Sequence, residues 1–300
     1  MNLDMMDKIR DFSLEKIEID CFSINDMRGQ DICLNYVPEL KNARRWNGKS
    51  YNQHIKNNPL LLEDARDLVW DFTLNLEEPT EHQLFKAVAR IVGGLPTNFP
   101  PMLVRQILKE FIKPGEILLD YSMGFGGRLL GAMTDGYQYI GFDTNKQTVI
   151  ENFKLAEAIY FALSEYSTIY EPVLINESSV NIGENMTEKS VDLAFSCPPY
   201  YSMEIYSSDE RDSVNSTLTY SQWLKDYVGK TCKAIYKVLK SGKYFLTYIG
   251  NVSPHGMDLN LCDDWIKMAE QNGFTLIEAR RPGTHPAYEN TRLLIFQKGE

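Results

Sequence analysis

The sequence predicts an α/β fold built on a doubly wound sheet whose last strand is antiparallel, preceded by an N-terminal α+β extension. Short apolar runs alternate with amphipathic segments from Glu116 to the end of the chain, which is typical of parallel strands joined by helices. A glycine-rich turn follows the first of these runs, as in Rossmann-like folds. Only residues 279–292 separate the last two expected strands, which is too short for a helical crossover, so we expect these strands to pair antiparallel.

The elements of this sheet are predicted from apolar runs for strands and from helical spacing of apolar residues for helices. The expected strands are 117–120, 139–143, 170–175, 191–195, 244–249, 274–278 and 293–297. The expected helices are 128–133, 145–165, 220–239 and 260–271. Residues 201–219 are polar and have no period, which predicts a loop or a lid over whatever the preceding strand presents.

The first 94 residues are expected to form an extension to a domain that spans residues 95–300. Apolar periodicity predicts helices over 59–74 and 81–92. A further helix is expected after Asn98-Phe99-Pro100-Pro101, because proline suits the first turn of a helix. Alternation of apolar and polar residues predicts a strand over 14–22, and 32–37 is a second candidate strand.

Composition favours a globular enzyme or binding protein of the cytoplasm. The chain has 300 residues, of which 43% are hydrophobic and 24% charged, and no run approaches the length of a membrane span. The first residues lack the basic head and apolar core of a signal peptide. Five scattered cysteines, without metal-ligand spacing, predict reduced thiols and no metal site. Nothing in the sequence indicates the oligomeric state.

One basic stretch stands out in a chain whose net charge of −10 argues against a generic nucleic-acid binder. Residues 41–56 contain no acid and interleave cations with aromatic side chains, the central members being Arg44, Arg45, Trp46 and Lys49. Such a pattern suits phosphate contact together with base stacking. A solvated basic surface would account for it equally well.

The glycine-rich turn indicates the kind of cofactor. It runs from Asp120 through Gly124 and Gly126, and it lacks the third glycine of a dinucleotide fingerprint. An acid at the strand end repels phosphate and attracts an ammonium or sulfonium group. Asp143 ends the next strand, where a carboxylate can accept hydrogen bonds from both hydroxyls of a ribose. These features together predict S-adenosylmethionine, which has a ribose, no phosphate and a cationic tail.

A second motif ends the strand 191–195. The chain continues as Ser196-Cys197-Pro198-Pro199-Tyr200, and the two prolines force it out of the sheet because proline cannot donate to a ladder. A rigid rim with an aromatic ring at the carboxyl edge of the sheet suits a flat ring that carries an amino group. Taken alone, the motif would be read as a strand that ends in a turn.

These motifs resemble those of the DNA amino-methyltransferases, the S-adenosylmethionine enzymes that methylate adenine N6 or cytosine N4, and most closely a group common in phages and mobile elements. The matching pieces are Asn98-Phe99-Pro100, residues 120–132, residues 139–143 and residues 195–207. The turn precedes the Pro-Pro-Tyr motif, which is one of the known motif orders. The resemblance covers residues 95–300 and implies that DNA is the partner. The lack of a long apolar run separately predicts that no membrane is involved.

The resemblance also implies roles for individual residues. Asn98 and Phe99 would contact the methionine end of the cofactor, and Ser178 would face its adenine. The turn itself would line the cofactor through Asp120, Ser122, Gly124 and Gly126. Asp143 would hold the ribose. Tyr200 would stack on a base flipped out of the helix, while the carbonyl of Pro198, the residue before it and the rigid Pro199 would hold the target amine.

Cys197 departs from this family, which has Asp, Asn or Ser before the two prolines. A thiol is a poor hydrogen-bond acceptor. Three interpretations follow: Ser196 or a water supplies the acceptor, Cys197 is partly a thiolate, or Cys197 is a nucleophile that permits methylation at pyrimidine C5. A buried structural cysteine is the plain alternative.

Other functions remain open at the level of sequence. The same chemistry could act on RNA or on a protein amide, since related Pro-Pro-Tyr enzymes of both kinds exist. A catalytically degenerate methyltransferase fold that only binds cofactor or nucleic acid is the non-enzymatic alternative, and Cys197 is its only hint.

Overall fold

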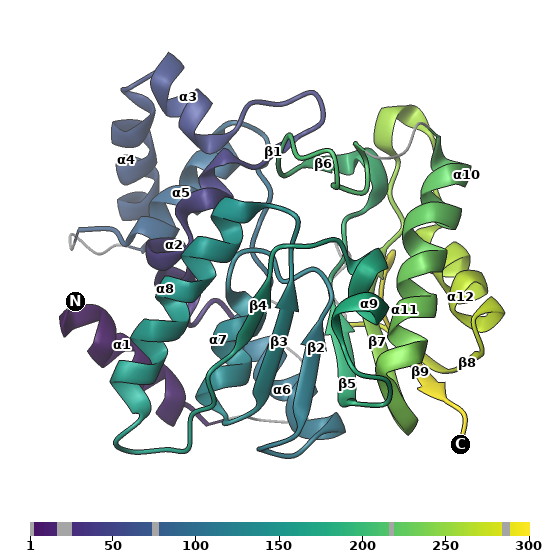
Figure 1. Ribbon diagram of the computed structural model, residues 1–300. Helices are drawn as coiled ribbons and strands as arrows, with labels where there is room; N and C mark the ends of the chain where they lie inside the picture. The colour runs from purple at the N-terminus through teal and green to yellow at the C-terminus, as the bar shows by residue number, and fades with distance from the viewer. Residues whose placement is uncertain (1–2, 17–25, 74–77, 216–218, 284–288) are drawn as a thin grey trace.

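A computed structural model describes residues 3–16, 26–73, 78–215, 219–283 and 289–300, and it confirms the predicted sheet (Figure 1). Seven strands lie in the order β4-β3-β2-β5-β7-β9-β8. Their bounds are β2 Ile117–Asp120, β3 Gln138–Phe142, β4 Val173–Ile175, β5 Val191–Ser196, β7 Leu239–Gly250, β8 Phe274–Arg280 and β9 Thr291–Lys298. The first five of these pair in parallel, and β9 lies antiparallel to both β7 and β8.

Two layers of helices enclose the sheet. One face is covered by α6 Pro101–Phe111, α7 Gly127–Thr134 and α8 Lys146–Leu163. The other is covered by α9 Ile182–Asn185, α10 Tyr220–Trp223, α11 Lys230–Val238 and α12 Leu261–Gln271. A π-helical segment, Leu224–Gly229, joins α10 to α11, so the helix expected over 220–239 is continuous.

The strands divide their side chains between these two layers because successive residues point to opposite faces. Leu118 and Phe195 belong to the core under α6–α8, whereas Leu119 and Ala194 belong to the core under α11 and α12. All four are fully buried. Because β2, β3, β4 and β5 are parallel, their carboxyl ends meet at one edge, and that edge positions the candidate site.

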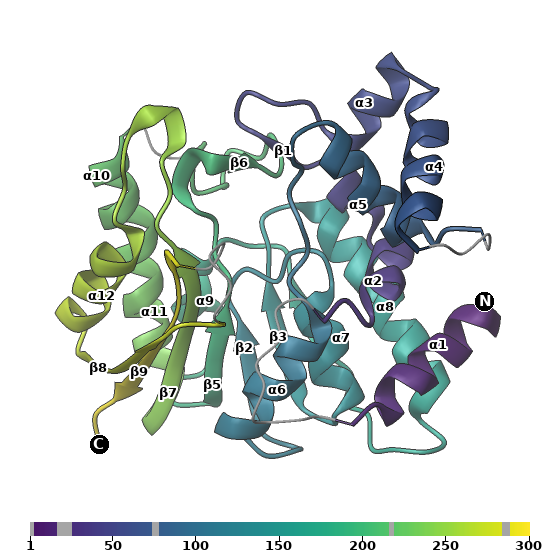
Figure 2. The same cartoon turned by 180° about the vertical axis from the view of Figure 1, so that it is seen from behind.

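The N-terminal region is helical, and this corrects two expectations. Its elements are α1 Leu3–Leu14, α2 Gln30–Tyr36, α3 Tyr51–Asn57, α4 Leu61–Thr73 and α5 Glu81–Ile91, which gather beside α8 (Figures 1 and 2). The strand predicted over 32–37 is wrong, because Ile32, Cys33 and Leu34 are buried on a helix that packs against α5 and α8. The strand predicted over 14–22 begins at the end of α1, and residues 17–25 lie outside the described part.

A two-residue strand in the basic stretch joins this region to the loop after β5. In an antiparallel pair, β1 Arg44–Arg45 lies beside β6 Glu204–Ile205, with Arg45 opposite Glu204 and Arg44 opposite Ile205. This pair brings together segments about 160 residues apart. Among the described helices, none is both long and apolar enough to cross a membrane.

Candidate active site

A cavity of about 490 Å³ opens at the carboxyl edge of the parallel strands. This volume lies in the range of small-molecule sites. Its walls come from the glycine turn, from the ends of β3 and β4, from the Pro-Pro-Tyr motif and from the N-terminal helices. Gln30 of α2 and Lys86 of α5 contribute, so the N-terminal region forms part of the site.

Asp120 organises the cavity floor from a fully buried position. Its carboxylate accepts hydrogen bonds from the Arg128 guanidinium at 2.7 Å, the Tyr139 hydroxyl at 2.7 Å and the Ser196 hydroxyl at 2.8 Å. Arg128 also donates to the carbonyl of Ser122. Asp120 therefore ties β2, β3, β5 and α7 together and does not line the cavity, which differs from the cofactor contact expected of it.

The glycines of the turn permit close packing behind the cavity. Gly124 and Gly126 have φ of 56° and 86°, in the left-handed region that glycine favours. An added Cβ at Gly127 would lie 2.1 Å from the carbonyl oxygen of Phe99, so helix α7 can approach the Asn98-Phe99 segment only without a side chain there. Gly124 lines the cavity, whereas Gly126 lies behind it.

Asp143 lies directly beyond β3 and lines the cavity. Its two carboxylate oxygens accept one backbone hydrogen bond each, from Gly124 at 3.0 Å and from Asn145 at 2.9 Å, which leaves each oxygen with further acceptor capacity. Burial, with smaller contributions from the nearby Asp212 and Asp120, raises the pKa of Asp143 to about 6, although the two backbone donors oppose the rise. The geometry suits a diol donor such as a ribose.

The Pro-Pro-Tyr motif forms the opposite wall. Cys197, Pro198, Pro199 and Tyr200 line the cavity, and the Cys197 sulfur lies 3.7 Å from the Tyr200 hydroxyl. Burial raises the pKa of the Cys197 thiol to about 11, although the Arg128 cation opposes the rise. Cys197 is therefore a neutral thiol at neutral pH, which disfavours the thiolate interpretation.

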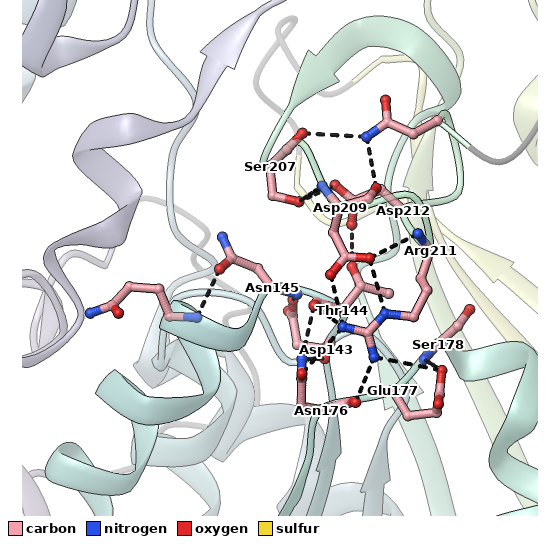
Figure 3. Close-up of polar contacts among 12 residues, drawn as sticks. Asp143, Thr144, Asn145, Asn176, Glu177, Ser178, Ser207, Asp209, Arg211 and Asp212 are labelled. Atoms are coloured by element: carbon pink, nitrogen blue, oxygen red, sulfur yellow. Dashed lines mark hydrogen bonds and ion pairs between the residues drawn. The ribbon is translucent and has the colours of Figure 1, made fainter.

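The loop after the motif makes polar contacts with the residues that follow β3 and β4 (Figure 3), and its Arg211 and Asp212 line the cavity there. Arg211 fastens it by donating to the carbonyl of Asn176 at 2.9 Å and to that of Thr144 at 3.1 Å. Asp209 accepts from the same guanidinium at 2.8 Å, and this bond lowers the pKa of Asp209 to about 2. Asp212 accepts hydrogen bonds from the hydroxyls of Thr144 and Ser207. We call residues 207–215 the strap.

Most of the residues predicted from sequence lie in this cavity. Its lining includes Asn98, Phe99, Ser122, Gly124, Asp143, Ser178, Cys197, Pro198, Pro199 and Tyr200. Ser196 differs from expectation, because it is fully buried and its hydroxyl donates to Asp120. The basic residues Arg44, Arg45, Trp46 and Lys49 lie outside the cavity, on and beside β1.

Sequence reasoning missed several residues of the site. Arg128, Glu204, Tyr206, Arg211 and Asp212 all line the cavity. A cation one residue after the glycine pair could have pointed to Arg128, because a charge at the start of a buried helix needs a partner. The others lie in the segment 201–219, which has no periodicity that could place them.

Comparison with known proteins gives the following similarities. A family model described as a DNA methylase, of the N6/N4 class, matches residues 31–154. No curated protein sequence matches the chain. Among solved structures, the chain is similar to an rRNA methylase from Streptococcus thermophilus, with 14% identity over 68% of this chain and 99% of the other and a TM-score of 0.44.

Two further structures show similarity of the same kind. A TehB-like SAM-dependent methyltransferase from Corynebacterium glutamicum has 15% identity over 72% of this chain and 95% of its own, with a TM-score of 0.44. Magnesium protoporphyrin IX methyltransferase from Synechocystis, with bound SAM, has 12% identity over 80% of this chain and 97% of its own, with a TM-score of 0.46.

The raised pKa of Asp143 predicts pH-dependent binding of the expected cofactor, S-adenosylmethionine. Ribose hydroxyls donate to the carboxylate form, so the affinity should fall as the pH drops through about 6. Calorimetric titration between pH 5 and 8, in roughly half-unit steps, measures this decrease in affinity. The Asp143→Asn variant should show no such decrease, and its affinity at pH 7 should be about tenfold weaker than that of the wild type. An affinity for the wild type that stays constant across this range would contradict the assignment.

The raised pKa of Asp143 also predicts how the stability of the fold depends on pH. The folded state holds the Asp143 proton more tightly than the unfolded chain does, so this group's stabilising contribution is present below its ordinary value of 3.8 and is lost as the pH rises through about 6. In the Asp143→Asn variant, the decline in unfolding free energy over this window should be smaller. Urea unfolding at pH 4, 5, 6 and 7 checks the sign.

The strap contacts predict that Arg211 slows release of the cofactor. Arg211→Ala removes the bonds to Asn176 and Thr144, and we expect dissociation of S-adenosylmethionine about tenfold faster, which corresponds to one charged hydrogen bond of roughly 1.4 kcal/mol. Stopped-flow displacement by S-adenosylhomocysteine measures this rate. Arg66→Ala, which breaks a distant exposed pair with Glu78, is the matched control and should leave it unchanged. Equal rates for both variants would show that the strap does not retain the cofactor.

Proposed function

We propose that this chain, an S-adenosylmethionine-dependent methyltransferase, transfers a methyl group to an exocyclic amine of a DNA base, adenine N6 or cytosine N4, that has been flipped into its cavity. The proposal is carried by one observation: a single cavity joins the glycine turn and Asp143 to the Pro-Pro-Tyr motif. The DNA methylase model that matches residues 31–154 supports the choice of DNA.

The residues around the cavity fit S-adenosylmethionine. Asp143 offers two carboxylate oxygens to a diol, Ser178 stands at the end of β4, and Asn98 and Phe99 stand at the opposite side of the turn. When bound, S-adenosylmethionine supplies the electrophilic sulfonium methyl group. The chain's own contribution is to hold the nucleoside at Asp143, to exclude water under the strap and to fix the direction of approach.

The Pro-Pro-Tyr wall suits a flipped base. Tyr200 offers an aromatic ring for stacking, and the rigid prolines fix the direction of the Pro198 carbonyl, which would accept a hydrogen bond from the target amine. The amine lone pair is delocalised into the base ring, so an acceptor that pulls on its protons makes the nitrogen more nucleophilic. Most of the rate enhancement would then come from positioning and electrostatics.

The N-terminal extension, residues 1–94, is proposed to grip the polymer in front of the catalytic domain, residues 95–300. Arg45, Trp46 and Lys49 are exposed, and β1 stands at the rim through its pairing with β6. In a chain of net charge −10, a local cationic patch is what could attract phosphate.

The reaction is tested by product analysis. Purified protein is incubated with labelled S-adenosylmethionine and, in parallel, with unmethylated plasmid DNA, total RNA and a protein extract, and the products are resolved by mass spectrometry. N6-methyladenine or N4-methylcytosine from the plasmid is the expected result. C5-methylcytosine, or label only in RNA or protein, would contradict the proposal, as would no transfer to any of them.

Tyr200→Ala should reduce methyl transfer to DNA at least a hundredfold and leave cofactor affinity within about twofold, because stacking on the base is its role. Tyr200→Phe is the matched control and should keep most of the activity, since it retains the ring. Radiometric rates and calorimetry measure the two quantities. Equal losses in both variants would assign the effect to the hydroxyl near Cys197 instead.

The cations on and beside β1 predict how the affinity for DNA depends on salt concentration. Replacing Arg44, Arg45 and Lys49 by alanine should weaken binding of a fluorescein-labelled duplex and reduce the slope of log K against log salt by roughly one unit per lost phosphate contact. Replacing the exposed Lys225, Lys230 and Lys233 by alanine removes the same charge elsewhere and should leave that slope unchanged. Identical slopes for wild type and the first variant would mean that the patch is a solvated surface.

A further inference from the structure

The target-amine end of the cavity holds a carboxylate that the motif does not include. Glu204, on β6, lines the cavity together with Cys197 and Tyr200. Its position is fixed from two sides: β6 pairs with β1, and the hydroxyl of Tyr206 donates to its Oε2. Among the described residues, the hydrogen bond from Tyr206 to Oε2 is the only one that the Glu204 side chain makes, so Oε1 retains its acceptor capacity.

Tyr206 connects Glu204 to the glycine turn. Its ring packs against that of Phe125 in the turn, with the ring centroids 6.0 Å apart. Glu204 is therefore held between the Pro-Pro-Tyr wall and the turn, which is where the target amine and the methyl donor must meet. The segment 201–219 thus supplies a positioned group, although the sequence predicts only a loop or lid there.

The two residues before the prolines leave the acceptor role unfilled. The Ser196 hydroxyl donates to Asp120 from a fully buried position, and Cys197 is a neutral thiol. A thiol accepts hydrogen bonds weakly. A carboxylate accepts them strongly, and Glu204 is the carboxylate that borders the cavity beside Cys197 and Tyr200.

We propose that Glu204 is the catalytic acceptor of this site: its carboxylate accepts a hydrogen bond from the exocyclic amine and removes the proton that methyl transfer releases. This inference rests on the proposed function. The nitrogen lone pair forms the N–C bond, the methyl C–S bond breaks, and its electron pair stays on sulfur as a neutral thioether. The alkylated nitrogen then gives one proton to Glu204, which passes it to solvent.

The charges around Glu204 suit this role. Burial raises its pKa, while the Tyr206 hydroxyl and the Arg45 cation lower it. Arg45 shares its face of the two-stranded sheet, because directly opposed residues of an antiparallel pair point the same way. Cys197, the third titratable neighbour, is neutral. The acceptor is the charged form, so the reaction should slow as the pH falls through the pKa of Glu204.

The test compares single-turnover methylation of unmethylated plasmid DNA at saturating S-adenosylmethionine from about pH 5 to 9. Glu204→Gln should lower the rate at pH 7 about a hundredfold and remove the fall in rate at acidic pH, which we call the acidic limb of the profile. Its cofactor affinity should stay within about twofold of the wild type. Glu270→Gln is the matched control, because Glu270 is an exposed carboxylate on α12 that lies outside the cavity, and it should leave the rate and its pH profile unchanged. Adding Cys197→Asp to the Glu204→Gln variant should raise the methylation rate at least about tenfold above that of Glu204→Gln alone, because it returns a carboxylate to the site.

A readout without turnover separates binding from chemistry. In cofactor-free protein, the carboxyl carbon of Glu204 is followed by NMR, and its titration midpoint should move to lower pH when plasmid DNA is added, because an amine donor stabilises the charged form. If Glu204→Gln does not fold, Glu204→Asp replaces it and should show a reduced rate with the acidic limb retained.

The outcomes distinguish this inference from the function on which it rests. Wild-type protein that methylates no DNA overturns the proposed function. Wild-type protein that methylates DNA, with Glu204→Gln within threefold of it and an unchanged pH profile, overturns the role of Glu204 alone. A rate loss with the acidic limb intact and no rescue by Cys197→Asp would make Glu204 structural, and would also overturn the inference.

Discussion

The buried ion pair between Asp120 and Arg128 is the interaction on which the site depends. Both side chains are withdrawn from water, and breaking such a pair typically costs about 3–5 kcal/mol because a charge remains uncompensated. Through Tyr139 and Ser196 the same carboxylate fixes the neighbouring strands, and through Ser122 the guanidinium fixes the turn. The chain thus uses an acid at this position to align both halves of the cavity.

The N-terminal region is structurally part of this arrangement. The side chains of Gln30 and Asn98 contact each other at 3.2 Å, and Gln30 also donates to the Asn98 carbonyl at 3.3 Å. On the opposite side, β1 pairs with β6 and thereby sets the position of Glu204. Because β1 and β6 belong to one small sheet, a displacement of β1 would also move Glu204 in the cavity wall.

The Pro-Pro-Tyr wall shows that a polar group can be supplied to the cavity by a segment outside the motif. Cys197 directly precedes the two prolines, and burial keeps it a neutral thiol. The neighbouring strand β6 brings a carboxylate to the same cavity. In a site that works mainly by positioning, an acceptor can come from another segment as long as its oxygen reaches the same point.

The sequence by itself determined the sheet, the glycine turn and the Pro-Pro-Tyr rim, because each is encoded by a local pattern: apolar runs, residues that permit positive φ, and prolines that end a strand. It failed over residues 32–37, where a short apolar run fits a strand as well as a helix and the packing against α5 and α8 decides. The tertiary structure alone decided that Asp120 pairs with Arg128, that Arg211 holds the strap and that Glu204 lines the cavity. Each of these depends on which distant segments meet, and no local periodicity carries that information.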